Sequence, residues 1–380
     1  MKKQLLAIGN ELKQQLCALS DFMYHNPELG NKEYKAAEKL TEFLTSYGFT
    51  VKRPLIGIET AFEAVYDSGR PGPSVAFLCE YDALPEIGHA CGHNMIAAMS
   101  AGAGVMLSKV MGEADSIKGG KIYVFGTPAE ETDGAKVAMT EAGVFDGITA
   151  ALMVHPSAAT RESGTSAALE ALQFSYRGKT AHAAGCPEDG INALNAVIQL
   201  FTGIDALRQH VPTDVRIHGI ITKGGVAANI VPDESVAQFY IRAATKEYLA
   251  TVKEKVLNIA QGAALMTGAA LEVANYEPSN DDLKTNQALS RSFNNNLRLL
   301  GITDIAPPPK GAGSSDIGNV SNVIPTIHPY IGITNEKIPG HTREFAQATI
   351  TKLAHERLLI GALALAYTGL DILTGEVGKL

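Results

Sequence analysis

The sequence has few cysteines, no basic cluster and no long apolar run, and each absence excludes a class of protein. The four cysteines are widely spaced without a pairing pattern, so we expect reduced thiols rather than a disulfide framework. The formal net charge is -8 and no lysine- or arginine-rich run is present, which argues against a nucleic-acid partner. Charged residues make up 19% of the chain and are scattered, as expected for solvated surfaces.

The start of the chain and its apolar segments also argue against a membrane partner. Residues 1–10 are polar and lack the apolar centre of a signal peptide. No stretch reaches the roughly 18 consecutive apolar residues that a bilayer span requires, and residues 358–367 suit only part of a buried helix. We therefore expect a cytoplasmic protein, and its 380 residues suit two domains.

Apolar periodicity predicts an α/β domain in the first part of the chain. Three short, continuously apolar runs at 74–79, 121–126 and 150–154 suit strands that are buried on both faces. Segments with helical spacing precede and separate these runs, and this alternation predicts a mainly parallel sheet. The expected helices are 11–23, 33–47, 95–110 and 134–142.

From Leu169 onward the pattern changes to that of a smaller α+β module. The strands alternate between apolar and polar residues, and the element order βαββαβ is that of a ferredoxin-like fold. We therefore predict a lid and dimerisation domain at 167–278, inserted into a catalytic domain formed by 1–166 and 279–380. The expected elements are a strand at 169–176, a helix at 190–209, strands at 216–222 and 235–243, a helix at 248–266 and a strand at 270–276.

Side chains that can bind metal ions follow each of the three strands of the predicted parallel sheet. The carboxyl ends of such strands meet at one edge, where ligand sites form. A lone histidine or glutamate pair is usually a core or surface feature, but three strand ends of this kind favour a site. Thiolate, imidazole and carboxylate groups suit zinc and similar divalent ions. The residues are Asp82, Cys91 and His93 after the first strand, Glu130 and Glu131 after the second, and His155 after the third.

The adjacent Glu130 and Glu131 could serve two different roles in one reaction. One carboxylate can bind a metal ion while its neighbour accepts a proton from a water molecule whose pKa the metal lowers to about 7. The same carboxyl group can then return the proton to the leaving amine. The pair therefore predicts hydrolysis with a carboxylate general base.

Several short motifs make the sequence similar to the M20 metallopeptidases. It most resembles their amidohydrolase branch, which includes the aminobenzoyl-glutamate hydrolase subunits, and a dipeptidase-like subgroup that includes β-alanyl-lysine dipeptidases. The motifs follow the family order and extend over nearly the whole chain. They are HNPELG at 25–30, DALP at 82–85, HACGH at 89–93, PAEE at 128–131, HP at 155–156, GKTAHA at 178–183, GG at 224–225, NIVP at 229–232 and GSSD at 313–316.

This resemblance implies a metal-dependent amidohydrolase or dipeptidase that binds two divalent ions. Zinc is the expected metal, and manganese and cobalt are alternatives that use the same ligands. Cys91 would bridge the ions. His93 and His155 would complete the site of one ion, and Glu131 and His341 would complete the site of the other.

The resemblance also assigns roles around these ligands. Glu130 would be the general base, and Asp82 would orient a ligand histidine. His328 is the alternative fifth ligand, but it lies in a strand-like run where the family usually has an apolar strand. His341 follows a Pro-Gly turn, where the last ligand of the family lies, and we therefore prefer it.

The smaller domain would contribute to substrate binding and to assembly. By resemblance, His182 and Asn229 would reach the substrate carbonyl, His182 across a homodimer, and stabilise the oxyanion. Arg242 would bind the substrate carboxylate through its forked guanidinium, although an ordinary charged strand end explains it equally well. The substrate would be a small N-acyl amino acid or dipeptide.

Two departures from the family pattern and two other functions stay open. Asn94 replaces the usual aspartate after Cys-Gly-His, and Ser315 replaces the glutamate common before Asp316, which puts the surroundings of the metal pair in doubt. A metal-independent hydrolase with Cys91 as nucleophile is one alternative, and sensitivity to chelators would distinguish it. The other is a non-catalytic ligand-binding or assembly protein, for which the general base would be useless.

Overall fold

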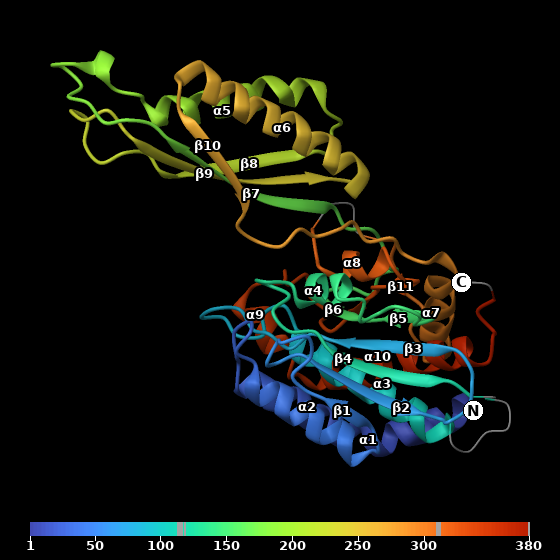
Figure 1. The fold of residues 1–380 in the computed structure, drawn as a ribbon. Coiled ribbons are helices and arrows are strands. Elements are labelled where there is room, and N and C mark those ends of the chain that lie inside the picture. The colour runs from blue at the N-terminus through green and yellow to red at the C-terminus, as the bar shows by residue number, and fades with distance from the viewer. Residues whose placement is uncertain (112–116, 118, 309–312, 379–380) are drawn as a thin grey trace. The chain divides into compact units, whose positions relative to one another are not determined.

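A computed structural model describes residues 1–111, 117, 119–308 and 313–378 of the chain. These residues form two compact units, and both are drawn in Figure 1. Unit 1 contains Met1–Thr165 and most of the chain from Leu283 onward. Unit 2 contains Ser166–Asp282 together with Gly313 and Ser314.

Unit 1 is built on a six-stranded sheet with the order β1-β2-β4-β3-β5-β11. Strands β4, β3, β5 and β11 run parallel to one another, which confirms the predicted α/β class with a mainly parallel sheet. Strands β1 and β2 were not expected, and they extend the sheet in antiparallel pairing. The strands are β1 (Thr50–Lys52), β2 (Phe62–Asp67), β3 (Ser74–Cys79), β4 (Lys121–Gly126), β5 (Ala150–Leu152) and β11 (Thr326–Ile327).

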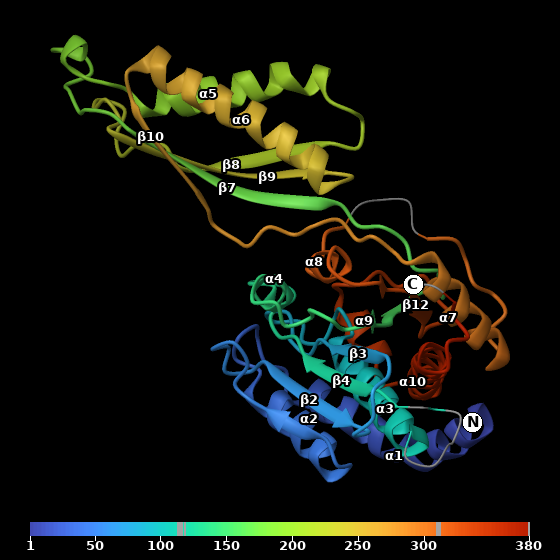
Figure 2. The ribbon, with the colours of Figure 1, turned by 45° about the vertical axis from the view of Figure 1, so that its right-hand side comes forward.

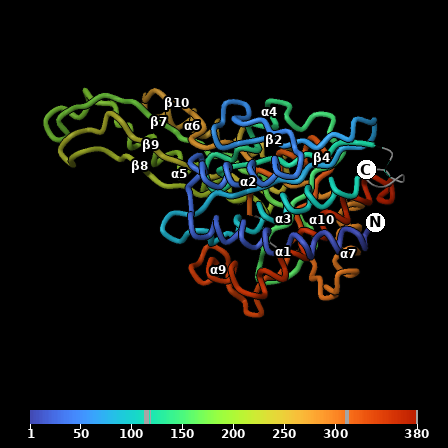
Figure 3. Tube along the Cα trace, turned by 90° about the horizontal axis from the view of Figure 1, so that it is seen from below, coloured from blue at the N-terminus to red at the C-terminus, as the bar shows by residue number. Residues whose placement is uncertain are grey.

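Helices cover both faces of this sheet because the side chains of a strand alternate between its faces. Val75 and Phe77 of β3 join the core beneath α1, α3, α7 and α10, whereas Ala76 and Leu78 join a second cluster with α4 and α8. Helices α1, α3 and α10 lie side by side in Figure 3. The helices are α1 (Lys2–His25), α2 (Tyr34–Ser46), α3 (His93–Met111), α4 (Ala135–Glu141), α7 (Gln287–Leu299), α8 (Ile317–Ser321), α9 (Arg343–Ala348) and α10 (Lys352–Leu373).

Helix α3 is the central helix of unit 1. By length and composition alone it could cross a membrane, which we did not anticipate from the sequence. Its apolar window is, however, 94% buried inside the structure, as is typical of a core helix. Gly104 permits this burial, because a Cβ atom there would lie 2.5 Å from Cγ2 of Val124 on β4.

Unit 2 is a four-stranded antiparallel sheet with two helices on one face (Figure 2). Its chain order βαββαβ and sheet order β10-β7-β9-β8 confirm the predicted ferredoxin-like class. On β9 the alternate residues Ala237, Phe239 and Ile241 are buried against α5 and α6. The elements are β7 (Ala168–Arg177), α5 (Ala193–Leu207), β8 (Arg216–Lys223), β9 (Glu234–Ala243), α6 (Lys246–Thr267) and β10 (Ala270–Asn275).

Unit 2 extends beyond the inserted segment that we expected at 167–278. The backbone groups of Leu169 and Asn280 exchange two hydrogen bonds, of 2.8 and 3.0 Å. This pairing lengthens the contact with β7 past the end of β10. The unit therefore runs to Asp282.

A short parallel pair of strands positions one predicted site residue in unit 1. Strand β6 (His155–Ser157) pairs with β12 (Tyr330–Gly332), and His155 lies opposite Tyr330. The backbone N–H of His155 also donates to the carbonyl of Pro329 at 2.9 Å. These bonds fix the backbone of His155 at the edge where the long strands end.

Candidate metal centre

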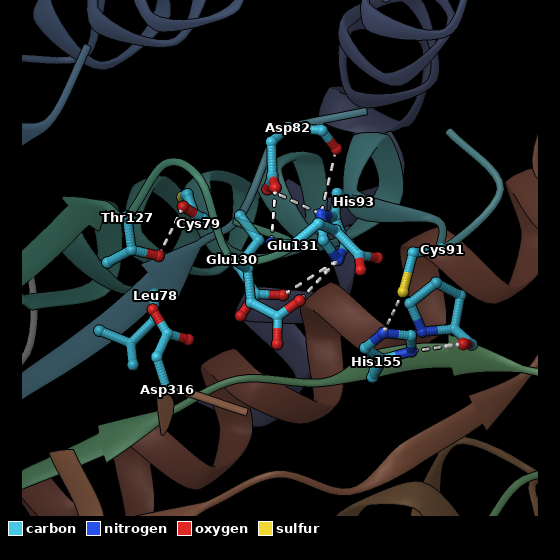
Figure 4. A network of polar contacts seen from close by, with 12 residues as sticks. Leu78, Cys79, Asp82, Cys91, His93, Thr127, Glu130, Glu131, His155 and Asp316 are labelled. Carbon is cyan, nitrogen blue, oxygen red and sulfur yellow. Dashed lines mark hydrogen bonds and ion pairs between the residues drawn. The ribbon is translucent and has the colours of Figure 1, made fainter. Parts of the chain in front are cut away.

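The predicted metal-site residues of unit 1 come from loops that follow the parallel strands (Figure 4). The loop after β3 contains Asp82 and Cys91, and it ends where α3 begins at His93. The loop after β4 contains the adjacent Glu130 and Glu131. Since β3 and β4 are parallel neighbours, their carboxyl ends bring the two loops to the same edge of the sheet.

Gly92 allows the Cys91 loop to approach His155. Its φ of +85° lies in the left-handed region, and a Cβ atom there would lie 2.4 Å from Cγ of Pro156. Glycine avoids both the strain and the clash. As a result, Sγ of Cys91 lies 3.3 Å from Nε2 of His155. The other ring nitrogen of His155 lies 2.6 Å from the carbonyl oxygen of Pro156, so Nδ1 donates and the lone pair of Nε2 is free to face the thiol.

Asp82 contacts two of the predicted ligands, His93 and Glu131. Its Oδ1 atom lies 2.9 Å from Nδ1 of His93, and its Oδ2 atom accepts a hydrogen bond from the backbone N–H of Glu131, also at 2.9 Å. Burial favours the neutral acid, but His93 and these hydrogen bonds hold the pKa of Asp82 below its usual value. The carboxylate thereby fixes the ring of His93 with Nε2 directed into the site.

Two groups of potential metal ligands in the described part of the chain share Cys91, and a third group, formed by His93, Glu130 and Glu131, takes one member from each. The ligand atoms of Cys91, His93 and His155 lie within 4.8 Å of one another, and so do those of Cys91, Glu131 and His341. Nε2 of His341 lies 3.2 Å from Oε1 of Glu131. The structure thus brings together the five predicted ligands in the same two sets that the family resemblance implies.

The two candidate fifth ligands occupy different places. His341 directly precedes Thr342, the N-cap of α9, and its backbone adopts a φ of +61° while its N–H donates to the carbonyl of Ala90 at 2.9 Å. His328 is buried, and its ring lies 5.5 Å from the ring of His155. Among the described residues, His328 belongs to no group of clustered ligand atoms. In the part of the chain that the structure describes, its buried Nε2 atom has no hydrogen-bond partner.

The donor atoms of this site fit a pair of divalent ions. Nε2 of His93 is buried and has no hydrogen-bond partner among the described residues, although Oε2 of Glu80 lies 3.5 Å away and the ring is held firmly at Nδ1. A buried nitrogen of this kind is costly unless a proton donor or a metal ion satisfies it. One thiol, three imidazoles and one carboxylate form a donor set that suits zinc and other first-row metals.

Glu130 lies beside the two ligand groups. Its Oε2 atom lies 3.9 Å from Nε2 of His93, and one of its oxygens lies within 4.8 Å of carboxylate oxygens of Glu80 and Asp316. Burial, followed by the charges of Glu80 and Asp316, raises the pKa of Glu130 well above its usual value. A raised pKa makes the carboxylate a stronger base, as a general base requires.

A buried ion cluster behind Glu130 was not recognised in the sequence. Nζ of Lys136 lies 2.7 Å from Oε1 of Glu80 and 2.6 Å from Oδ1 of Asp316, and all three side chains are buried. Burial opposes the charge of Lys136, yet the two carboxylates raise the pKa of its ammonium above the usual value. The available indication was a single lysine among the apolar residues of helix 134–142, and it did not identify a partner.

The thiol of Cys91 bears on the proposal of a metal-independent nucleophile. Burial raises the pKa of this thiol to about 12. A nucleophilic cysteine needs a lowered pKa, because the thiolate is the reactive form. Without a metal ion, Cys91 therefore stays protonated at neutral pH, which argues against the cysteine-hydrolase alternative.

The first departure from the family pattern lies outside the ligand groups. Nδ2 of Asn94 donates to the hydroxyl of Ser20 at 3.0 Å and to that of Thr349 at 3.2 Å. Asn94 thus ties the start of α3 to α1 and to the segment after α9. Ser315, the second departure, directly precedes Asp316 of the buried ion cluster.

The predicted substrate-binding residues belong to unit 2. An isolated β-bridge joins His182 to Ile230, which brings His182 next to Asn229. Arg242 lies near the other end of β9, where its guanidinium lies 5.6 Å from the ring centre of Tyr240. Their proposed contacts with the substrate stay predictions.

Comparisons with known proteins identify relatives of this chain. Residues 166–265 match the peptidase dimerisation domain. Over 98% of its length the chain is 36% identical to Xaa-Arg dipeptidase from Mus musculus, of which it covers 89%. It is also 28% identical to one of the p-aminobenzoyl-glutamate hydrolase subunits of Escherichia coli, over 95% of the chain and 89% of that protein.

Solved structures share the whole fold. A protein from methicillin-resistant Staphylococcus aureus, described as a putative aminohydrolase, matches with a TM-score of 0.83 and 21% identity over 98% of this chain and 100% of that one. A Bacillus subtilis protein, described as a dinuclear metal-binding peptidase from the M20 family, matches with a TM-score of 0.73 and 20% identity over 96% of this chain and 99% of that one.

Proposed function

Since this chain belongs to the M20 family of metallopeptidases, we propose that it hydrolyses the amide bond of small dipeptides or N-acyl amino acids at a site for two metal ions. Its named relatives are hydrolases of such bonds, and the predicted class of enzyme is confirmed at that level. The observation that carries the proposal is the pair of ligand groups that share Cys91 and adjoin Glu130.

The proposed ligands divide between the two ions as the clusters do. Cys91, His93 and His155 would hold one ion, and Cys91, Glu131 and His341 would hold the other. When bound, the ions would polarise the scissile carbonyl group and lower the pKa of a water molecule. Zinc is the proposed metal because a thiol and imidazoles dominate the donor set.

The remaining chemistry falls to Glu130. Its carboxylate would accept a proton from the attacking water and then donate that proton to the nitrogen of the leaving amine. The raised pKa of Glu130 supports this role, because it favours uptake of a proton by the carboxylate. Asp82 would keep His93 and the backbone of Glu131 in place during the reaction.

Dipeptides with a basic C-terminal residue are the proposed substrates to test first. The support is the 36% identity to Xaa-Arg dipeptidase over almost the entire chain. Arg242 would bind the C-terminal carboxylate through two parallel N–H groups, a geometry that guanidinium and carboxylate groups share. His182 and Asn229 would stabilise the negative charge that develops on the carbonyl oxygen.

Unit 2 would also form a homodimer. Strand β8 is an edge of its sheet, and apolar side chains on and beside it are exposed, with Ile220 at 63% and Val226 at 86%. An edge strand with exposed apolar residues invites pairing with a second copy. The match of residues 166–265 to the peptidase dimerisation domain supports the same assembly.

Metal content and substrate range test the proposed function together. Purified protein would be stripped with a chelator, reloaded with zinc, manganese or cobalt, and assayed against Xaa-Arg, Xaa-Lys and Xaa-Leu dipeptides and N-acyl amino acids. We expect two ions per chain, no turnover in the stripped protein and recovery on reloading. Full activity in stripped protein would refute the proposal.

A substitution at Cys91 separates the metal enzyme from the cysteine hydrolase. Cys91→Asp keeps a side chain that can bind two ions, whereas it removes the nucleophile of the alternative mechanism. We expect Cys91→Asp to retain bound metal and measurable turnover, and Cys91→Ala to lose both. A cysteine hydrolase would lose turnover equally in the two variants.

A further inference from the structure

The residue directly before the proposed general base has an unusual backbone conformation. Ala129 adopts a φ of +60°, in the left-handed region that residues with a Cβ atom rarely occupy, and it is fully buried. This conformation turns the chain after β4 so that Glu130 and Glu131 follow in the site. Some interaction must hold Ala129 in place, because an alternative φ would redirect both glutamates.

The carbonyl of Ala129 accepts hydrogen bonds from the N–H groups of Thr132 and Gly134 at 3.1 and 2.7 Å. Glu33 binds the N–H group of the same residue from a distant part of the sequence. Its Oε1 atom accepts a hydrogen bond from the backbone N–H of Ala129 at 2.8 Å, and the Glu33 side chain is buried. This side-chain oxygen satisfies a buried N–H group that would be costly to leave without an acceptor. Glu33 occupies the N-cap position of α2, but its side chain makes no capping hydrogen bond. Its carboxylate is therefore directed to the loop and does not serve its own helix.

The segment around Glu33 fits closely against the same loop. A Cβ atom on Gly30 would lie 2.3 Å from Oγ1 of Thr132 and 3.1 Å from Cα of Ala129, so glycine permits the contact. Next to it, Nδ2 of Asn31 donates to the carboxylate of Asp133. Three neighbouring residues of one segment thus contact the loop that carries the glutamates.

The other end of this segment is fixed to the Asp82 loop and to α2. The backbone N–H of Ala83, which follows Asp82, donates to the carbonyl of Glu28 at 2.8 Å. The Glu28 carboxylate accepts hydrogen bonds from the N–H groups of Lys35 and Ala36 at 2.9 and 3.0 Å. The segment from Glu28 to Glu33 therefore connects the two loops of the metal centre.

We propose that Glu33 is a positioning residue for hydrolysis, which holds Ala129 in its left-handed conformation and so directs Glu130 toward the reacting water. Glu33 belongs to none of the groups of clustered ligand atoms among the described residues. The HNPELG segment at 25–30 and the residues that follow it to Glu33 would thus position the loop that contains Glu130. The role of Glu33 rests on the proposed role of Glu130.

The test compares two variants with the wild-type enzyme. Glu33→Gln keeps a carbonyl oxygen that can accept the N–H of Ala129, whereas Glu33→Met has a similar length and no acceptor. We expect Glu33→Met to bind two metal ions and keep KM within about twofold, but to lower kcat by about 10- to 100-fold, as small displacements of a catalytic group do. Glu33→Gln should restore at least a third of the wild-type kcat.

A second substitution asks whether the conformation of Ala129 is the cause. Glycine adopts positive φ without the steric penalty of alanine. We therefore expect Ala129→Gly to raise the kcat of the Glu33→Met enzyme severalfold, with the Ala129→Gly single variant as reference. If the two substitutions combine without any recovery, or if Glu33→Gln is as slow as Glu33→Met, the proposal is overturned.

Hydrogen exchange in the metal-free protein provides a readout that does not depend on activity. Peptides that cover 128–133 should exchange faster in Glu33→Met than in Glu33→Gln, while peptides of unit 2 exchange equally. Uniformly faster exchange would indicate a merely structural role and overturn the proposal. If Glu130→Gln proved fully active, the assignment of the base would fail, whereas the local exchange result would still report on the Glu33–Ala129 bond.

Discussion

The Oδ1 atom of Asp82 lies 2.9 Å from Nδ1 of His93, and both side chains are buried. Asp82→Asn should therefore weaken metal binding by about 10- to 100-fold, because an amide neither carries the charge nor reliably fixes the imidazole tautomer. Competition with a chromogenic chelator would measure the change. Unaltered metal affinity in Asp82→Asn would remove this residue from the support of the centre.

Glu130→Gln should separate metal binding from turnover. The amide cannot accept a proton, so we expect kcat to fall by about 100- to 10,000-fold while the ligand groups stay intact. Elemental analysis of the variant should still give two ions per chain. Wild-type turnover in the fully loaded variant would exclude Glu130 as the base.

Substitution of His341 and substitution of His328 should have different effects on the number of bound metal ions. His341 lies in a ligand group with Cys91 and Glu131, so His341→Ala should lose one of the two ions. His328 lies outside those groups, and His328→Ala should keep both. The reverse result would show that His328 is the fifth ligand.

The stability of the metal-free protein should depend on pH through Glu33. Burial, with a smaller effect from Asp82, raises the pKa of Glu33 from its ordinary value of 4.5 to about 7. The folded state then holds this proton more tightly than the unfolded state, so Glu33 lowers stability as pH rises from about 4.5 to 7.

Glu33→Gln removes that dependence and provides the measurement. From pH 5 to pH 8, its free energy of unfolding relative to wild type should rise by roughly 1 to 3 kcal/mol. Urea denaturation of both metal-free proteins at the two pH values would show it. An equal difference at both values would mean that Glu33 is ionised in both states throughout.

If unit 2 forms the proposed homodimer, substitutions in this unit should alter the oligomeric state or the turnover. Ile220→Lys places a charge on the exposed edge strand β8 and should shift the protein to monomers in light scattering. His182→Ala should lower turnover much more than metal content, because His182 lies outside the metal centre. A fully active wild-type monomer would contradict both the homodimer and a role for His182 across it.

Much of the fold was predictable where one physical requirement dominates the sequence. Residues 74–79 and 121–126 are buried on both faces or nearly so, and their continuous apolar runs gave the bounds of β3 and β4. Strand β6 has three residues, one of them proline, and no periodicity can identify so short an element. Helix α1 begins at Lys2, well before residue 11, because tertiary packing buries Leu5 and half-buries Ile8 in a stretch that is too short to show a helical repeat by itself.

Some features of the candidate site could also be predicted from the sequence, whereas others could not. Side chains at strand ends could be assembled from the order of elements. The choice of His341 over His328 came from resemblance, since the turn before His341 and the strand-like run around His328 indicate a ligand only by comparison with the family pattern. The partners of Lys136 and the conformation of Ala129 were not predictable. Both depend on contacts between residues far apart in sequence, namely Lys136 with Asp316 and Ala129 with Glu33.

Because Cys91 belongs to both ligand groups, its oxidation would affect the binding of both metal ions. Sulfur is the one ligand atom of the five that peroxide converts readily to oxygen acids, and Cys91 is partly exposed. Because the same sulfur belongs to both ligand groups, its oxidation would remove a ligand from both ions in a single event. In the metal-free protein the raised pKa keeps the Cys91 thiol protonated, which slows its oxidation, because the thiolate is the form that peroxide attacks.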